Sequence, residues 1–425
     1  MNAVDVDEVR AWIAASWDLD LSLAEWWRRL AAAGLAFPHW PEGLGGRGWS
    51  PAESRVVARE LGAAGAVAPP TGVGQAMGGP TVIAHGTEGQ RQALVPGLAS
   101  GEDGWCQLFS EPSSGSDLAG LQTTAVRDGD EWVVNGQKVW NSGAHNADRG
   151  LLLARTDPSV PKHQGISYFV IDMDQPGVDA RPLRQMNGGA DFDEVFLTDA
   201  RVPADRLIGE LGGGWHVAQT TLAHERANIG TRTAGGAVFP SGGRYGLLDE
   251  RVGDLLARAA ASTRGPISGF VIPPRVLVDL AREFGRHDDP VIRQRLVAFR
   301  AMADTNRWNG QRTRAAAAQG TKPGVDANLA KLNVANMART SRDLALAIIG
   351  PYGMLAGDDA PHGGAVQTVA LSSPAASLGG GTDEIQRNVI GERGLGLPRE
   401  PQADKDVPFR DLPMGTRRER GAGDA

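Results

Sequence analysis

The sequence contains almost no cysteine. Cys106 is the single cysteine among 425 residues, so no intrachain disulfide can form and a reducing, cytoplasmic setting is expected. No sequence motif places a base beside Cys106, and a lone cysteine is usually a small core residue. We therefore do not expect Cys106 to act as a nucleophile.

Long apolar runs and an excess of basic residues are also missing. No run approaches the roughly 20 apolar residues of a membrane-spanning helix, and the acidic N-terminus lacks the apolar core of a signal peptide. The net charge of −7 argues against nucleic-acid binding, which needs a basic face. Hydrophobic residues make up 41% and charged residues 22%, so the composition is that of a globular protein long enough for two or three domains.

The pattern along the chain changes twice. Residues 1–104 are mostly helical, with apolar residues at helical spacing from Val9 to Ala33 and a further helix expected at Pro51–Leu61. Residues 105–209 contain short alternating runs between turn signals, which predict an antiparallel β-domain. Amphipathic patterns return in residues 210–398 and predict a bundle of long helices. The fold class is therefore α+β, in the order α, β, α.

Two segments interrupt this order. Residues 230–274 are rich in turn-forming residues on both sides of a short helical stretch, Leu247–Ala260, and are interpreted as an insertion. The insertion is either a surface excursion or a lid over a site. Residues 399–425 are polar and rich in Pro, Gly and Arg, so a poorly ordered tail is expected.

Two motifs in the β-region place hydroxyl groups beside aromatic rings. Ser110 follows Phe109 in the segment Leu108–Gly120, and Ser142 lies two residues after Trp140. A stacking surface with nearby hydroxyls suits a flat, hydrogen-bonding heterocycle. On pattern alone, two polar turns in a β-domain explain these residues equally well.

The literal sequences of these motifs resemble the flavin-binding core of the acyl-CoA dehydrogenases. That family carries a (Ser/Thr)-Glu-Pro-x-x-Gly-Ser-Asp loop and a downstream Lys-x-Trp-x-(Ser/Thr) strand. Three further segments resemble the family: His85–Glu102, Val195–Glu210 and Gly379–Pro398. The resemblance implies an N-terminal helical domain, a middle antiparallel β-barrel domain, a C-terminal four-helix bundle and an FAD cofactor, with no metal.

The family reaction is α,β-dehydrogenation of an acyl-CoA thioester, in which a carboxylate removes the α-proton and the β-hydride goes to flavin N5. Many members carry this carboxylate just before the Gly-Thr of the C-terminal motif, where this chain has Gly380. A minority carry it on the first helix after the β-domain, followed by Arg, where this chain has Glu225 and Arg226. The resemblance therefore implies that Glu225 is the base, that Arg226 lies on the substrate side and that the Gly380 N–H donates to the thioester carbonyl. The alternative is a solvated charged pair at 225–226.

The flavin contacts are carried over in the same way. Trp140 is expected to cover a ring face, Ser142 to lie near N5 and Ser116 near the phosphates or the CoA entry. Glu111 is interpreted as structural, fixing its turn. Arg286 or Gln294 could serve in place of Arg282, because the spacing there departs from the family. The other expected contacts are Gln107, Leu108 and Ser110 along the pyrimidine, and Arg282, Gly350, Gly353, Thr382 and Glu384 reaching a partner's flavin.

The resemblance leaves several functions open. An acyl-CoA dehydrogenase passing electrons to an electron-transfer flavoprotein, in fatty acid or acyl-CoA metabolism, is the leading interpretation. The same chemistry on a carrier-protein-tethered acyl group, a flavin oxidase or hydroxylase, and a non-catalytic subunit of a mixed assembly are the alternatives. A homo-oligomer, dimer or tetramer, is expected. With the base at 225, the pocket is expected to accept branched, long or ring-bearing acyl groups.

Overall fold

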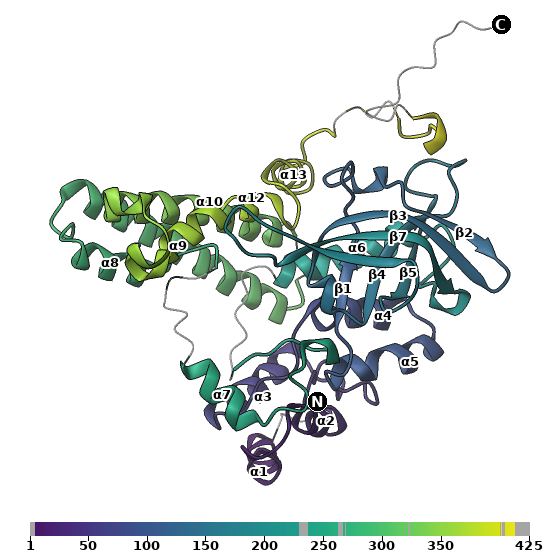
Figure 1. Ribbon diagram of the computed structural model, residues 1–425, viewed down its shortest axis with the longest axis horizontal. Coiled ribbons are helices and arrows are strands. Elements are labelled where there is room, and N and C mark those ends of the chain that lie inside the picture. Colours follow the sequence, from purple (N-terminus) through teal and green to yellow (C-terminus); the bar gives the residue numbers. More distant parts are fainter. Residues whose placement is uncertain are drawn as a thin grey trace, which may run out of the picture.

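The computed structural model describes residues 5–228, 237–261, 267, 269–321, 324–399, 401 and 404–412. Helices dominate the first hundred residues (Figure 1). The apolar pattern from Val9 to Ala33 forms two helices, because the chain turns before Ser22, whose side chain accepts from Glu25 N and caps the second helix. The expected helix at Pro51–Leu61 is confirmed. The elements are α1 (Val6–Ser16), α2 (Leu23–Ala32), α3 (Pro51–Ala63), the π-helical turn η1 (Gly74–Gly78), α4 (Gly79–His85) and α5 (Glu88–Ala99).

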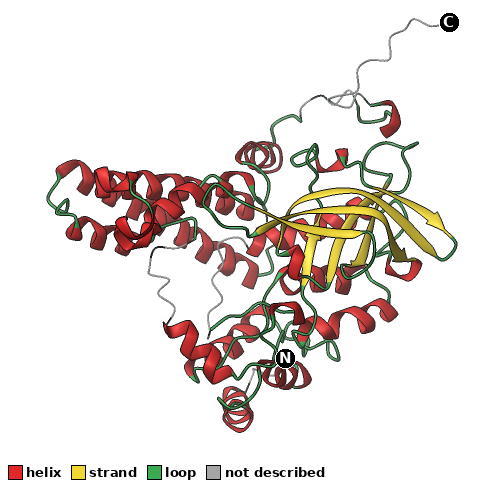
Figure 2. Cartoon of the chain, viewed as in Figure 1, coloured by secondary structure: helices red, strands yellow, loops and turns green. Residues whose placement is uncertain are grey.

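The middle of the chain forms a curled seven-stranded sheet (Figure 2). Its order is β1-β4-β2-β3-β7-β6, with β5 paired to β4 off this path, so the described strands make a half-barrel. The antiparallel prediction holds for β2–β3, β3–β7, β4–β5 and β6–β7. It is wrong for the pairing of β1 with β4 and for the short pairing of β2 with β4, which are both parallel, because these strands meet β4 across intervening segments instead of through a hairpin. The strands are β1 (Trp105–Leu108), β2 (Thr124–Asp128), β3 (Glu131–Ser142), β4 (Arg149–Arg155), β5 (Ile166–Asp172), β6 (Val178–Leu183) and β7 (Phe192–Pro203).

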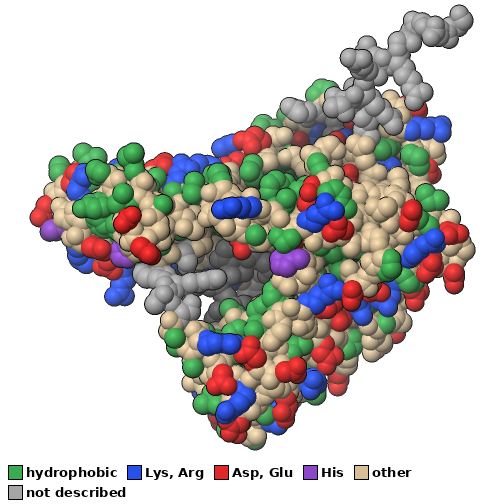
Figure 3. Space-filling model, in the orientation of Figure 1, with side chains coloured by type: hydrophobic (Ala, Val, Ile, Leu, Met, Phe, Trp, Pro, Cys, Tyr) green, Lys and Arg blue, Asp and Glu red, His purple; other side chains and the backbone are tan. Residues whose placement is uncertain are grey.

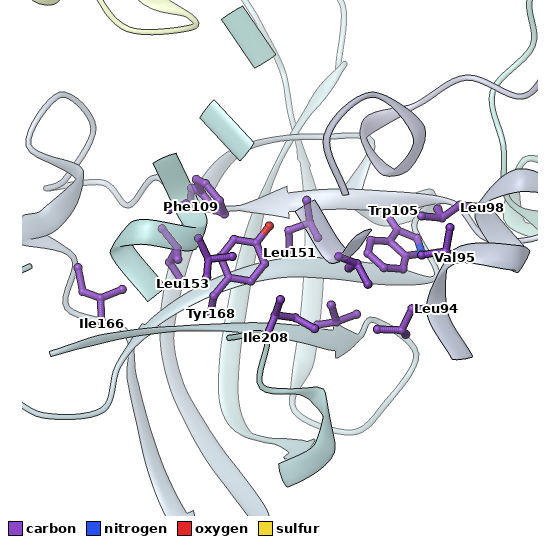
Figure 4. Close-up of a cluster of buried hydrophobic side chains, with 14 of the residues drawn as sticks. Leu94, Val95, Leu98, Trp105, Phe109, Leu151, Leu153, Ile166, Tyr168 and Ile208 are labelled. Carbon is purple, nitrogen blue, oxygen red and sulfur yellow. The ribbon is translucent and has the colours of Figure 1, made fainter. Parts of the chain in front are cut away.

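Each face of the sheet packs into a different core. Successive side chains of a strand point to opposite faces, so Trp105 on β1 joins the helices of the N-terminal region, whereas Cys106 and Leu108 enter the interior of the curl. Figure 4 shows the first of these cores, in which Leu94 and Val95 of α5 lie near Trp105. Burial raises the pKa of the Cys106 thiol, in keeping with a core residue that is not a nucleophile.

The C-terminal region is an elongated helical bundle (Figure 1). Four helices, α8 to α11, enclose a core that includes Leu280, Phe299, Leu344 and Val369. No helix among the described residues is long and apolar enough to cross a membrane. The helices are α6 (Gly214–Asn228), α8 (Pro274–Glu283), α9 (Pro290–Ala318), α10 (Asp326–Ile349), α11 (Ala365–Ser372), α12 (Ala375–Leu378) and α13 (Asp383–Val389).

Part of the insertion packs along the N-terminal region. We call residues 237–251 the strap; α7 (Val252–Ala261) follows it. Ala68 N donates to Ala237 O at 2.9 Å, and Leu23 N donates to Glu250 O at 2.9 Å. The strap is therefore held along its length by backbone hydrogen bonds. Residues 229–236, 262–266 and 268 of the predicted insertion lie outside the described residues.

The expectation of a poorly ordered tail is wrong for residues 404–412. Phe409 is buried, with the Arg155 guanidinium carbon 3.3 Å from its ring centroid. Phe409 N also donates to Val160 O at 2.9 Å. Phe409, the ion pair between Lys162 and Asp404 and backbone hydrogen bonds thus fix this segment to the β-domain. Residues 413–425 lie outside the described residues.

Candidate active site

Glu225 lies in the last turn of α6 and faces β1. Gln107 Nε2 donates to Glu225 Oε2 over 3.4 Å, so the carboxylate meets the strand predicted to border the flavin. Burial raises the pKa of Glu225, and the hydrogen bond from Gln107 and the charge of Arg226 oppose that shift only in part. Burial likewise lowers the pKa of Arg226. The pair is therefore partly buried, unlike a charged step on a solvated helix face.

The loop after β1 is fixed by a buried ion pair. Lys138 Nζ lies 2.8 Å from Glu111 Oε1 and also donates to Phe109 O at 3.1 Å. The same carboxylate accepts from the backbone N–H groups of Gln122 and Thr123 at 2.7 and 2.9 Å. Burial alone would raise the pKa of Glu111, but the attraction of Lys138 and these hydrogen bonds outweigh it and lower the pKa. The structural interpretation of Glu111 is confirmed.

Trp140 lies at a β-bulge in β3. The register between β3 and β7 shifts between Val139 and Asn141, and Trp140 adopts φ +64° in the left-handed region. This conformation is costly for a residue with a side chain and persists where the surrounding structure imposes it. The bulge turns the indole outward, where it is 62% exposed and contacts Phe192 edge-on. A large aromatic surface is thereby presented to a ligand or partner.

The hydroxyl groups predicted to bind the flavin are available in the described part of the chain. The backbone of Ser110 is fixed by a hydrogen bond, which its carbonyl accepts from Val139 N at 2.9 Å. Among the described residues, no hydrogen bond engages the hydroxyls of Ser110, Ser116 or Ser142. Leu108 is fully buried in the curl, backbone included, so this residue is not exposed to a ligand. Free hydroxyls beside an exposed indole fit the edge and face of a flavin.

The C-terminal motif forms a turn at Gly380 followed by α13. Gly380 has φ +66° and its carbonyl accepts from Gln386 Nε2 at 2.8 Å. Thr382 caps α13 by accepting from Ile385 N at 3.3 Å, and Glu384 pairs with an arginine one turn on. The left-handed backbone at 380 favours glycine, so a side chain there would be strained.

Profiles of three protein-family domains match the chain in sequence order. They are the acyl-CoA dehydrogenase N-terminal domain at residues 6–102, the middle domain at residues 106–200 and the C-terminal domain at residues 278–395. The chain belongs to the acyl-CoA dehydrogenase family. The strap and α7 lie between the second and third matched segments.

Individual relatives agree with this membership. Acyl-CoA dehydrogenase IpdE1 from Mycobacterium tuberculosis is 40% identical over 382 residues, which cover 88% of each chain. FadE34 from the same organism is 37% identical over 94% of this chain, which spans half the length of FadE34. The solved structure titled Tcur3481-Tcur3483 steroid ACAD has a TM-score of 0.68 at 28% identity and covers 93% of this chain and 97% of its own. The ChsE4-ChsE5 complex from Mycobacterium tuberculosis has a TM-score of 0.65 at 26% identity, with 94% and 99% covered.

The residues expected to reach a partner's flavin lie in the bundle of this acyl-CoA dehydrogenase. Arg282 is on α8 and pairs with Asp279. Helix α8 lies at the end of the bundle remote from β3 (Figure 1). Arg286 pairs with Asp289. Gly350 caps the C-terminus of α10 with φ +57°, and Gly353 follows in the next turn. Within one chain, α8 and its Arg282 therefore lie away from β3, which carries Trp140 (Figure 1).

Sequence reasoning missed several residues that shape the site. Lys138 was seen only as part of a motif, although it is the buried cation that anchors the loop at 111. Asn141 Nδ2 donates to Gln107 O at 2.6 Å and joins β3 to β1. Tyr245 of the strap lies against the end of β3. The only local sequence signal among these residues is the lysine at position 138, inside a predicted strand. The contacts of Asn141 and Tyr245 join segments that lie far apart in the sequence.

Proposed function

We propose that this acyl-CoA dehydrogenase removes the α-proton of an acyl-CoA thioester with Glu225 while the β-hydride passes to bound FAD. The observation that carries this proposal is the partly buried Glu225 carboxylate against Gln107 on β1, combined with Gly380 where many relatives place the base. A carboxylate whose pKa is raised is a better proton acceptor than one in water.

In this proposal, three residues act on the substrate. Glu225 takes the α-proton, and the Gly380 N–H donates to the thioester carbonyl, where negative charge develops as the proton leaves. Losing one such donor typically slows a reaction by about 10²–10³-fold. Arg226 lies beside the base on the substrate side and offsets part of the cost of holding a charged carboxylate out of water.

The exposed indole and free hydroxyls support FAD as the cofactor. FAD, when bound, supplies the hydride acceptor at its N5. Trp140 would cover one ring face and Ser142 would hydrogen-bond near N5, while Ser110 and Gln107 would hold the pyrimidine edge. Ser116 would lie near the phosphates. We further propose an electron-transfer flavoprotein as the electron acceptor.

We propose that FAD binding also involves a second subunit. Hydrophobic side chains lie exposed along the bundle (Figure 3), and the solved relatives named above are titled as protein pairs. Arg282, Gly350, Gly353, Thr382 and Glu384 would then contribute to the flavin site of the neighbouring chain. Large apolar side chains exposed on these helices and their connections include Val297, Trp308, Met354, Leu371, Leu378 and Leu395.

Anaerobic mixing with acyl-CoA tests the proposal. Glu225→Gln is expected to keep FAD and bind acyl-CoA but to lose flavin bleaching by about 10²–10⁴-fold, the usual contribution of a positioned base. Glu42→Gln is the matched control, since the Glu42 side chain is exposed. Bleaching of Glu225→Gln at the parental rate would assign the base elsewhere. Bleaching by an acyl-carrier protein but by no acyl-CoA would favour the carrier-linked alternative.

A further inference from the structure

A cavity of about 400 Å³ lies where the strap crosses the start of β1. One wall comes from the strap itself, through Ser241 and Tyr245. The opposite wall is the end of β3 and the turn after it, including Ser142. A third side is formed by residues 71–73, just before η1. The cavity thus joins the insertion to the strand that carries the proposed flavin contacts.

The cavity begins close to the proposed base. Trp105 lines the cavity, and Gln107, two residues further along β1, contacts Glu225. Residues two apart in a strand share a face and lie about 7 Å from one another. An acyl group with its α-carbon at Glu225 can therefore extend its remote atoms along β1 into the cavity.

The walls carry polar groups where a tunnel for a plain alkyl chain would be apolar. The cavity is lined by the polar residues Ser241, Tyr245, Asn146 and Asp191. Burial raises the pKa of Tyr245, and the negative charge of Asp193 acts in the same direction, so the phenol stays protonated and able to donate. Polar groups in a ligand cavity set orientation and specificity.

The strap forms a fixed wall. Ser241 N donates to Thr71 O at 3.0 Å, and Ser241 Oγ donates to Gln75 Oε1 at 3.1 Å. The backbone of the strap approaches so closely that a Cβ on Gly104 would lie 2.7 Å from Ser241 O. A Cβ on Gly143 would lie 2.8 Å from the Tyr245 hydroxyl. Groups held in this way are preorganised for a ligand.

We propose that Tyr245 and Ser241 are specificity-determining residues that favour acyl groups bearing a hydroxyl or ketone at the end remote from the thioester. This inference rests on the proposed function, because it assumes that the acyl group enters along β1 from Glu225. A site that hydrogen-bonds a substrate oxygen discriminates against the analogue that lacks it, since its own polar groups are then left unpaired.

Matched pairs of acyl-CoA substrates test this inference on the FAD-loaded enzyme. Each pair shares one cyclic carbon skeleton, with or without a ring ketone or hydroxyl, and kcat/KM is measured from flavin bleaching. The parent is expected to prefer the oxygenated member. Tyr245→Phe should lower kcat/KM for that member by about fivefold to tenfold, the value of one hydrogen bond, and leave the hydrocarbon member within about twofold.

Two further variants keep the test independent of folding. Ser241→Ala should reduce the same preference, whereas Ser159→Ala, which alters an exposed turn of the β-domain, should not. A parent that prefers the hydrocarbon member, or an unchanged preference in Tyr245→Phe with an unchanged melting temperature, overturns the inference. Loss of FAD from Tyr245→Phe also overturns it, since the cavity then belongs to the flavin. A parent bleached by no acyl-CoA instead contradicts the proposed function.

Discussion

The pH dependence of turnover follows from the environment of Glu225. A base works only when deprotonated, and burial raises the pKa of Glu225, so flavin bleaching should fall as the pH drops through this raised value. Gln107 stabilises the charged carboxylate, so Gln107→Leu should move the midpoint of kcat/KM against pH to a still higher pH. Coincident profiles for the parent and Gln107→Leu would contradict this assignment.

The same pKa predicts how Glu225 affects stability. The folded state binds the carboxyl proton more tightly than the unfolded chain does, so the contribution of this group is fully present below the unfolded pKa. It is lost as the pH rises through the folded pKa. Glu225→Gln should therefore raise the melting temperature at mildly alkaline pH and change it little in acid. Thermal melts across this pH range check the sign, and a loss of stability in alkali would refute it.

The backbone at Trp140 predicts a conflict between stability and flavin binding. The left-handed conformation at φ +64° costs about 1–2 kcal/mol for a residue with a side chain. Trp140→Gly should relieve part of that cost, whereas both Trp140→Gly and Trp140→Ala should weaken FAD retention by about 1 kcal/mol or more through lost stacking. Fluorescence titration with FAD and thermal melts measure the two effects. Unchanged FAD affinity in Trp140→Ala would remove the indole from the flavin site.

The loop between β1 and β2 depends on the Glu111–Lys138 pair. Lys138→Met would leave the buried carboxylate unpaired, and breaking such a pair typically costs about 3–5 kcal/mol. Adding Glu111→Gln should recover part of this loss, because the second substitution removes the stranded charge. Urea denaturation of the two variants and the parent measures the difference. A double variant less stable than Lys138→Met would show that the charge is not the cause.

The sequence predicted helices and strands well where the pattern lies within one segment, and poorly where the structure depends on contacts between distant segments. The amphipathic spacing of Val276 and Leu280 lies inside α8, and the alternation of Phe192 to Thr198 lies inside β7. The parallel pairing of β1 was missed because its partner strand lies far along the chain. Phe409 was missed because its buried site is built by residues around Arg155 and Val160.

Within the proposed site, the sequence selected the residues that belong to family motifs and missed those that lie outside them. Literal motifs selected Trp140, Ser142 and Glu225 as candidates through the family resemblance, and their roles stay predictions. Tyr245 could not be found in this way, since it belongs to the insertion, where no family motif applies. Its position depends on the backbone of the strap crossing β1 at Gly104.

At the scale of the whole molecule, the exposed side chains of the bundle predict self-association. Val297 and Trp308 on α9 are 66% and 56% exposed, and large exposed apolar patches mark protein–protein interaction sites. We expect a dimer or tetramer with FAD shared between chains. Val297→Glu should weaken both assembly and FAD retention, because a buried unpaired carboxylate costs several kcal/mol, on the order of 3.

Sedimentation velocity with absorbance at the flavin band separates the possible assemblies. A parent that sediments as a dimer or tetramer with one FAD per chain supports a homo-oligomer, and Val297→Thr, which adds no charge, should assemble like the parent. A monomer that retains stoichiometric FAD would contradict the shared site. A chain that binds FAD only after a homologous second subunit is added would place the proposed cross-subunit residues, Arg282 among them, in a mixed assembly, as the titles of the solved pairs describe for those relatives.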